Sequence, residues 1–151
     1  MKFNIMFVDD CISVLKSLKW IFMDEPYHIF LFESPLKALS VIEDKEFAVI
    51  VSDQMMSEME GIEFLKQVKQ RSPDTEVMIM SGFVKPAAVS NAINHGVVNR
   101  FIEKPLDINE IKQAVAIELA QYETNIENRN VRMSLHQPHN VFPLFEKCTI
   151  R

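Results

Sequence analysis

Polar residues suited to chemistry follow four short apolar runs of this 151-residue chain. Asp9 and Asp10 follow the first run and Asp53 follows the third. Ser81 follows the fourth run and Lys104 follows the fifth. Carboxylates bind hard divalent cations, while hydroxyl and ammonium groups bind phosphoryl oxygens. Brought together, these side chains would form an acidic site for a metal ion and a phosphoryl group.

The charge expected at such a site predicts a bound cation. Asp9, Asp10 and Asp53 would carry about −3 together, which is unfavourable unless a cation binds or a carboxyl group is protonated. Mg²⁺ and Lys104 would bring the sum to about zero. A phosphoryl group attached to one of these carboxylates would then leave about −1 with the metal and about −3 without it, so phosphoryl transfer at this site is predicted to require Mg²⁺.

The elements that must position these residues alternate regularly along the chain. The apolar runs are apolar almost throughout, which is typical of parallel strands covered on both faces. Five βα units predict a doubly wound α/β sandwich with right-handed crossovers, in which functional groups collect at the carboxyl ends of the strands. We expect strands at Phe3–Val8, Tyr27–Phe32, Phe47–Ser52, Thr75–Met80 and Val97–Ile102, and helices over 11–23, 35–44, 60–71, 86–95 and 107–122.

Several helix ends carry their own signals. Ser34-Pro35 combines an N-cap hydroxyl with proline at the first helical position. The segment 107–110, Asp-Ile-Asn-Glu, is similar to a capping box. Pro86 is expected to open the fourth helix and Gly96 to close it.

These residues, in this order, resemble the receiver domain of two-component response regulators over residues 3 to about 122. Residues 53–61, Asp-Gln-Met-Met-Ser-Glu-Met-Glu-Gly, resemble the phospho-acceptor loop of that family. Residues 78–82, Met-Ile-Met-Ser-Gly, resemble its hydroxyl-bearing strand end, and residues 101–105, Phe-Ile-Glu-Lys-Pro, its aromatic and Lys-Pro signature. The resemblance implies a flavodoxin-like (βα)5 three-layer sandwich with a five-stranded parallel sheet of order 2-1-3-4-5.

The resemblance also implies a role for each site residue. Asp53 would be the nucleophile that accepts a phosphoryl group as an acyl phosphate. Asp10 would bind Mg²⁺ directly and Asp9 through water, and the backbone carbonyl of Met55 would complete the ligands from the protein. Ser81 and Lys104 would bind phosphoryl oxygens. Phe101 would rotate inward as Ser81 moves, unless it is a static core aromatic.

Two departures from the family pattern lie beside Asp53 and Ser81. Ser57 occupies a position where the family commonly has proline, so the loop after Asp53 is expected to be less rigid. Met55 and Phe83 are apolar at positions where polar side chains in other members orient a hydrolytic water. We therefore expect slow self-dephosphorylation.

The partners implied are a sensor histidine kinase or a phosphotransfer protein, and the chain is not expected to be an enzyme. The resemblance also admits a homodimer through the fourth helix, fifth strand and fifth helix, and an output domain or a downstream protein. Residues 81–83, 92–96 and 100–101 are similar to receivers linked to phosphohydrolase or cyclic-dinucleotide output domains.

Three other classes of protein use a similar fold or a similar set of acidic residues. A haloacid-dehalogenase phosphatase needs a second Asp where Met55 stands. A flavodoxin-like redox protein needs a phosphate loop where Asp9, Asp10 and Cys11 would repel the phosphate. A receiver-fold module that binds proteins without phosphorylation stays open as the alternative.

Composition bounds the remaining expectations. The chain is 48% apolar with a net charge of −5, which indicates a globular domain and disfavours direct binding to nucleic acid. No segment reads as a signal peptide or membrane span, and the two cysteines favour a reducing compartment, so we expect a cytoplasmic protein without membrane contact. Cys11 is expected to be buried, and Trp20 to lie in the core or at the rim of the first helix.

The pattern weakens after Tyr122. We expect a receiver domain over 1–122, with 12 Lys and Arg against 18 Asp and Glu, and a C-terminal extension over 123–151 with four against three. The extension is expected to be helical to about Met133 and irregular beyond it. Its apolar cluster is expected to dock on the domain; its members are Val141, Phe142, Leu144 and Phe145.

Overall fold

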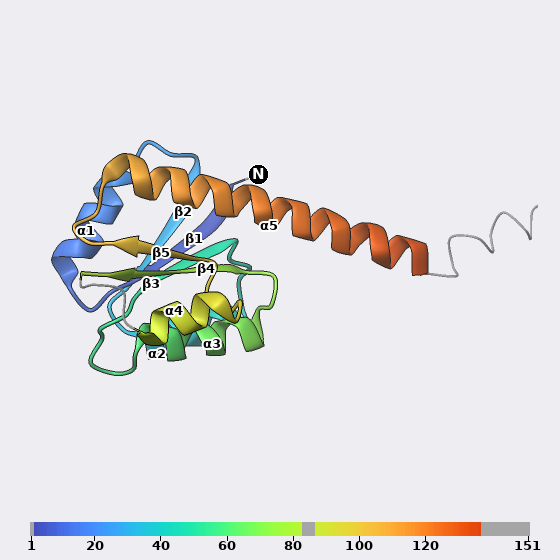
Figure 1. Ribbon diagram of the computed structural model, residues 1–151. Helices are drawn as coiled ribbons and strands as arrows, with labels where there is room; N and C mark the ends of the chain where they lie inside the picture. The colour runs from blue at the N-terminus through green and yellow to red at the C-terminus, as the bar shows by residue number, and fades with distance from the viewer. Residues whose placement is uncertain (1, 83–86, 137–151) are drawn as a thin grey trace, which may run out of the picture.

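The computed structural model describes residues 2–82 and 87–136. Five parallel strands form one sheet of order β2-β1-β3-β4-β5, with helices on both faces (Figure 1). The strands are β1 (Phe3–Val8), β2 (Tyr27–Phe32), β3 (Val49–Asp53), β4 (Glu76–Ser81) and β5 (Arg100–Glu103). The helices are α1 (Ile12–Ile21), α2 (Pro35–Ile42), α3 (Gly61–Arg71), α4 (Ala87–Asn94) and α5 (Ile108–His136). The doubly wound α/β sandwich of order 2-1-3-4-5 is confirmed.

The sheet separates two hydrophobic cores. Helices α1 and α5 cover one face, and α2, α3 and α4 cover the other (Figure 1). The central strands β3 and β4 are buried along their whole length, as their unbroken apolar runs predict, whereas the outer strand β2 is half-exposed. The α1–α5 core includes Phe7, Leu18, Phe22 and Val115, and the α2–α4 core includes Phe47, Phe64, Leu65 and Val89.

Two predicted helix starts are confirmed by hydrogen bonds. The Lys37 N–H donates to Ser34 Oγ at 3.2 Å, with Pro35 at the first helical position of α2. The Glu110 N–H donates to Asp107 Oδ1 at 2.9 Å at the start of α5. Gly96, with φ +73°, follows α4 in the left-handed region, as expected for a helix end. Pro86 lies outside the described residues.

Strand β5 begins later than the apolar pattern predicts. The prediction was Val97–Ile102, but the strand starts at Arg100. The N–H groups of Val97 and Val98 donate to the Ala92 carbonyl at 2.8 and 3.3 Å, which ends α4 instead of extending the sheet. An apolar pair can therefore be buried beneath a helix end and still resemble a strand in the sequence.

Helix α5 is the longest element and continues past Tyr122 without a break. Its 29 residues span about 43 Å at the α-helical rise, and its C-terminal half projects away from the sheet (Figure 1). The helical extension expected to about Met133 is present through His136, where the described residues stop. The cluster expected to dock, Val141, Phe142, Leu144 and Phe145, lies outside the described residues. None of the described helices is long and apolar enough to span a bilayer.

A buried polar cluster fastens α5 to the amino-terminal edge of the sheet. The carboxylate of Glu76, only 3% exposed, accepts hydrogen bonds from Asn99 and, at 2.8 Å, from Asn125 Nδ2. Glu118 of α5 accepts from Asn99 Nδ2 and from Arg100 Nε, both at 3.3 Å. These donors satisfy two carboxylates that burial would otherwise disfavour.

One expectation about helix α1 is corrected, and a second is narrowed. Cys11 is exposed rather than buried, because it occupies the N-cap position where the chain enters α1. Trp20 is 66% exposed, so of the two places expected for it the core is excluded, because α1 turns a different face to the core. The buried residues of that face are Leu15, Leu18 and Ile21.

Candidate functional site

The carboxyl ends of four strands bring the predicted residues to one edge of the sheet. Asp9 directly follows β1, and Asp53 is the last residue of β3. Ser81 ends β4, and Lys104 directly follows β5. The Lys104 N–H donates to the Ser81 carbonyl at 2.8 Å, which holds these two strand ends together.

Three carboxylates gather at this edge. One oxygen from each of Asp9, Asp10 and Asp53 lies within 4.8 Å of the others. Asp9 is fully buried and Asp53 is 6% exposed, whereas Asp10 is exposed to solvent. The Cys11 N–H donates to Asp9 Oδ1 at 2.9 Å and fixes that side chain. An all-oxygen donor set with one side open to water suits Mg²⁺, so the residues present fit the metal that the sequence predicts.

Lys104 joins two of these carboxylates. Its Nζ lies 2.7 Å from Asp9 Oδ2 and 3.1 Å from Asp53 Oδ1. Burial opposes the charge of this ammonium group, but hydrogen bonds and attraction to Asp9 and Asp53 outweigh it and raise the pKa of Lys104. Lys104 therefore remains a fixed positive charge beside Asp53.

The environment of Asp53 disfavours its charged form. Burial raises the pKa of the Asp53 carboxyl above its ordinary value, and the negative charge of Asp9 raises it further. The hydrogen bond from Lys104 and its positive charge lower the pKa again, but only in part. A nearby cation stabilises the charged form of a buried carboxylate that faces a second carboxylate, and the acidic cluster is suited to hold such a cation.

Ser81 and Phe101 lie on the adjacent strands β4 and β5. Ser81 is buried and pairs with Glu103, and Phe101 pairs with Ile79. The Phe101 side chain is partly buried against the α2–α4 core. Met55 lies in the loop after β3, with a side chain that is 61% exposed. Phe83 lies outside the described residues.

Two residues that support Asp53 escaped the sequence reasoning. Gln54 is buried, and its Oε1 accepts the Ile62 N–H at 3.0 Å at the start of α3. The Gln54 carbonyl accepts the Gly61 N–H at 2.9 Å. A Cβ atom on Gly61 would lie 2.1 Å from the Asp53 carbonyl oxygen, so only glycine lets α3 begin this close to β3. The available signal was the position of both residues inside the motif quoted for Asp53.

Comparison with known proteins identifies the family to which this chain belongs. The family model for the response regulator receiver domain matches residues 5–116. This chain belongs to that family. Transcriptional regulatory protein ZraR of Klebsiella oxytoca is 32% identical over 117 residues, which cover 78% of this chain and 26% of that protein. Sporulation initiation phosphotransferase F of Bacillus subtilis is 30% identical over 112 residues, covering 74% of this chain and 90% of that protein.

The fold of this chain also occurs in a solved structure. A crystal structure of adenylate cyclase from Rhodopirellula baltica matches with a TM-score of 0.83 and 28% identity, covering 88% of this chain and 98% of that chain. The chain spans about a quarter of the length of the ZraR relatives it matches. Receiver domains are generally regulatory modules of two-component signalling, and this chain is one of them.

Proposed function

We propose that this receiver domain accepts a phosphoryl group on Asp53 from a histidine kinase or a phosphotransfer protein, and changes its surface in response. The observation that carries the proposal is the position of Asp53 beside the Lys104 ammonium group, which also contacts the buried Asp9, with Asp10 at the open side. A carboxylate oxygen of Asp53 is the nucleophile: its bond to phosphorus forms as the P–N bond of a phosphohistidine donor breaks, and the imidazole leaves.

Each neighbouring residue has a task in this proposal. Lys104 pairs with a phosphoryl oxygen and offsets charge that develops during transfer. Asp10 would hold Mg²⁺ directly and Asp9 through water, together with Asp53 and the Met55 carbonyl. When bound, this ion supplies two positive charges that make a phosphorylated Asp53 tolerable. Ser81 donates its hydroxyl to another phosphoryl oxygen, and Phe101 follows its movement inward.

The surface around the site suits a protein donor. Three exposed apolar side chains surround the acidic edge: Ile12 opens α1, Met55 follows β3 and Ile108 opens α5, with exposed fractions of 53%, 61% and 43%. Exposed apolar groups around a polar centre are typical of protein interaction sites. We propose that the phosphodonor docks on this edge.

A small phosphodonor tests the proposal directly. Incubation with acetyl phosphate and Mg²⁺ should add the mass of one phosphoryl group, and fragmentation should locate it at Asp53. Removal of Mg²⁺ with a chelator should abolish the adduct, as should Asp53→Asn. Asp24→Asn, at an exposed position in the turn after α1, is the matched control and should leave the adduct intact. An intact domain that forms no adduct would favour a protein-binding module that acts without phosphorylation.

We further propose that the phosphorylated state is long-lived. Met55 offers no polar group to orient a water molecule beside Asp53, and hydrolysis of the acyl phosphate needs such a water. The decay of phosphorylated protein should therefore be slow, and Met55→Gln should accelerate it. A lifetime of seconds that Met55→Gln leaves unchanged would contradict this proposal.

The output is proposed to lie beyond the receiver fold. ZraR is a transcriptional regulatory protein and the Rhodopirellula baltica neighbour is an adenylate cyclase, so related receivers occur in proteins with different outputs. Helix α5 is the element that leaves the domain, and we propose that it carries the signal either to an output domain or to a downstream protein. A homodimer through α4, β5 and α5 is the other arrangement that the family admits.

A further inference from the structure

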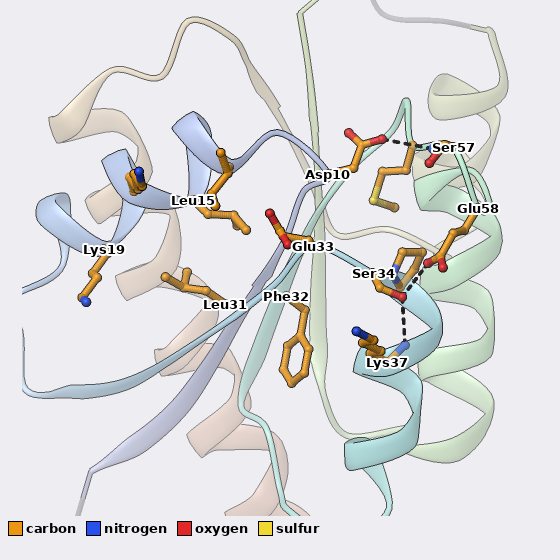
Figure 2. A pocket seen from close by; sticks show the side chains of 14 residues that line it. Asp10, Leu15, Lys19, Leu31, Phe32, Glu33, Ser34, Lys37, Ser57 and Glu58 are labelled. Atoms are coloured by element: carbon orange, nitrogen blue, oxygen red, sulfur yellow. Dashed lines mark hydrogen bonds between the residues drawn. The ribbon is translucent and has the colours of Figure 1, made fainter.

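Two neighbouring residues of the loop between β3 and α3 are bonded to loops at the ends of other strands. The backbone N–H of Ser57 donates to Asp10 Oδ2 at 3.1 Å, across to the loop after β1 (Figure 2). Ser34 Oγ, after β2, donates to Glu58 Oε1 at 2.6 Å (Figure 2). Both bonds lie along a groove of about 590 Å³ whose wall includes Asp10, Ser34 and Ser57.

The hydrogen bond from the Ser57 N–H holds Asp10, the exposed carboxylate of the acidic cluster. Asp9 is held by the Cys11 N–H and by Lys104, and Asp53 by Lys104. Asp10 is exposed, so a bond to its carboxylate restricts rotamers that solvent would otherwise leave accessible. The N–H occupies one lone pair of Oδ2, which leaves the remaining lone pairs of the carboxylate available to a cation. In this orientation an Asp10 oxygen already lies within 4.8 Å of oxygens of Asp9 and Asp53.

The Glu58 bond holds the backbone that carries this N–H. The Ser34 hydroxyl donates to Glu58 and accepts the Lys37 N–H at 3.2 Å, so it uses its donor and an acceptor at once. Ser34 is the N-cap of α2, which makes it a fixed point rather than a free loop residue. At the other end of the same loop, Gln54 is bonded to the start of α3.

We propose that Ser57 is a positioning residue for the metal ligand Asp10. Its N–H orients the Asp10 carboxylate toward Asp9 and Asp53 before a cation binds, and the bond between Ser34 and Glu58 keeps that N–H in place. The inference rests on the proposed function, since the cation is the Mg²⁺ of the phosphorylation site. The donor is a backbone group, so its effect depends on residue 57 having an N–H and not on the serine hydroxyl.

Magnesium binding measured by calorimetry separates the N–H from the side chain. Ser57→Pro removes the donor and should weaken Mg²⁺ binding roughly three- to tenfold, the range of a single modest hydrogen bond. Ser57→Ala keeps the N–H and should bind within about twofold of the wild type. A folded Ser57→Pro variant that binds Mg²⁺ as tightly as Ser57→Ala overturns the proposal.

A second pair of variants leaves the Ser57 backbone donor in place. Glu58→Ala removes the hydrogen bond between Ser34 and Glu58. Glu60→Ala removes an equal charge from the same loop, at a side chain that makes no capping bond. Glu58→Ala should weaken Mg²⁺ binding more than Glu60→Ala, and equal effects overturn the proposal even if Ser57→Pro fails to fold.

Hydrogen exchange gives a readout that does not involve the metal. The Ser57 amide should be protected from exchange in the metal-free wild type, and Asp10→Ala should remove this protection. If the wild type binds no Mg²⁺, the metal-dependent function fails and the inference fails with it, although a protected amide would still show the hydrogen bond. If the wild type binds Mg²⁺ and the Ser57 amide is unprotected, the inference alone fails.

Discussion

A single ammonium group offsets part of the negative charge of the two buried carboxylates at the acidic edge. Lys104 contacts Asp9 and Asp53, and both contacts are shielded from solvent. They therefore differ from exposed ion pairs, which contribute little to stability. The third carboxylate, Asp10, lies in solvent and is held by a loop amide. Lys104 thus offsets one of the two buried negative charges, and the third carboxylate faces the side from which a cation or donor arrives.

The raised pKa of Asp53 predicts a pH-dependent gain in stability when its charge is removed. Burial and then Asp9 make the folded protein bind the Asp53 proton more tightly than the unfolded chain does. The contribution of this group therefore decreases as pH rises from its ordinary pKa through the raised value. Asp53→Asn should shift the urea midpoint upward at pH 7 without Mg²⁺, and the shift should shrink below pH 4. A downward shift at pH 7 would show that attraction to Lys104 dominates.

Gly61 is predicted to be intolerant of any side chain. The added Cβ of Gly61→Ala would meet the Asp53 carbonyl oxygen at 2.1 Å and the Ile79 side chain at 2.7 Å. The backbone must shift to relieve this overlap, which should cost about 1–3 kcal/mol in the free energy of unfolding. Gly82→Ala is the control, because among the described residues its Cβ would meet only the Lys104 Cβ, at 3.8 Å. Denaturant unfolding should separate the two, and equal stabilities would contradict the prediction.

The residues that the sequence predicted and those that it missed differ in a physical way. Asp9, Asp53 and Lys104 were identified because a polar residue directly after a buried strand must lie at a sheet edge. Glu76 and Glu118 gave no such signal, since acidic residues at a strand start and on a helix usually face water. Their burial depends on Asn99, Asn125 and Arg100, and these partners meet only after α5 packs across the sheet.

Helix α5 shows what local signals determine and what they leave to packing. Its start follows from Asp107, whose carboxylate caps the first turn. The helix expected to about Met133 includes every described residue up to His136, because no proline or glycine interrupts the segment. The start of β5 was harder to predict, because Val97 and Val98 are apolar for a different reason: they cover the end of α4.

Asn125 is predicted to stabilise the attachment of α5 to the sheet. Its Nδ2 donates to the buried Glu76 carboxylate at 2.8 Å, so Asn125→Ala leaves an acceptor with one donor fewer. The free energy of unfolding should fall by about 1–3 kcal/mol at pH 7. Burial already raises the pKa of Glu76, and loss of the Asn125 bond removes an influence that lowers it, so the penalty should diminish toward acidic pH. Asn128→Ala, at an exposed position of the same helix, should change stability by less than about 0.5 kcal/mol. Equal losses in both variants would contradict the role of the Glu76 bond.

The molecule as a whole keeps its reacting groups and its projecting helix at opposite edges of the sheet. Asp9, Asp53 and Lys104 lie at the carboxyl ends of the strands, whereas Glu76 is the first residue of β4 and binds α5 at the amino edge. Helix α5 crosses the sheet between these edges, with Ile111, Val115 and Leu119 buried beneath it. A change at the acidic edge therefore has a continuous packed element through which to reach the projecting half of α5.

This separation predicts that shortening α5 affects stability and phosphorylation differently. A chain ending at Tyr122 lacks the bond from Asn125 to Glu76 and the ion pair between Arg129 and Asp74, whereas a chain ending at His136 keeps both. The shorter chain should be less stable by about 1–3 kcal/mol in urea, because a buried carboxylate loses a donor. Both chains should acquire one phosphoryl group at Asp53 from acetyl phosphate, with rates within about twofold, since the lost bond to Glu76 lies at the opposite edge of the sheet from Asp53. If the shorter chain folds but is phosphorylated much more slowly, the two edges are energetically coupled through α5, and the receiver unit extends beyond Tyr122.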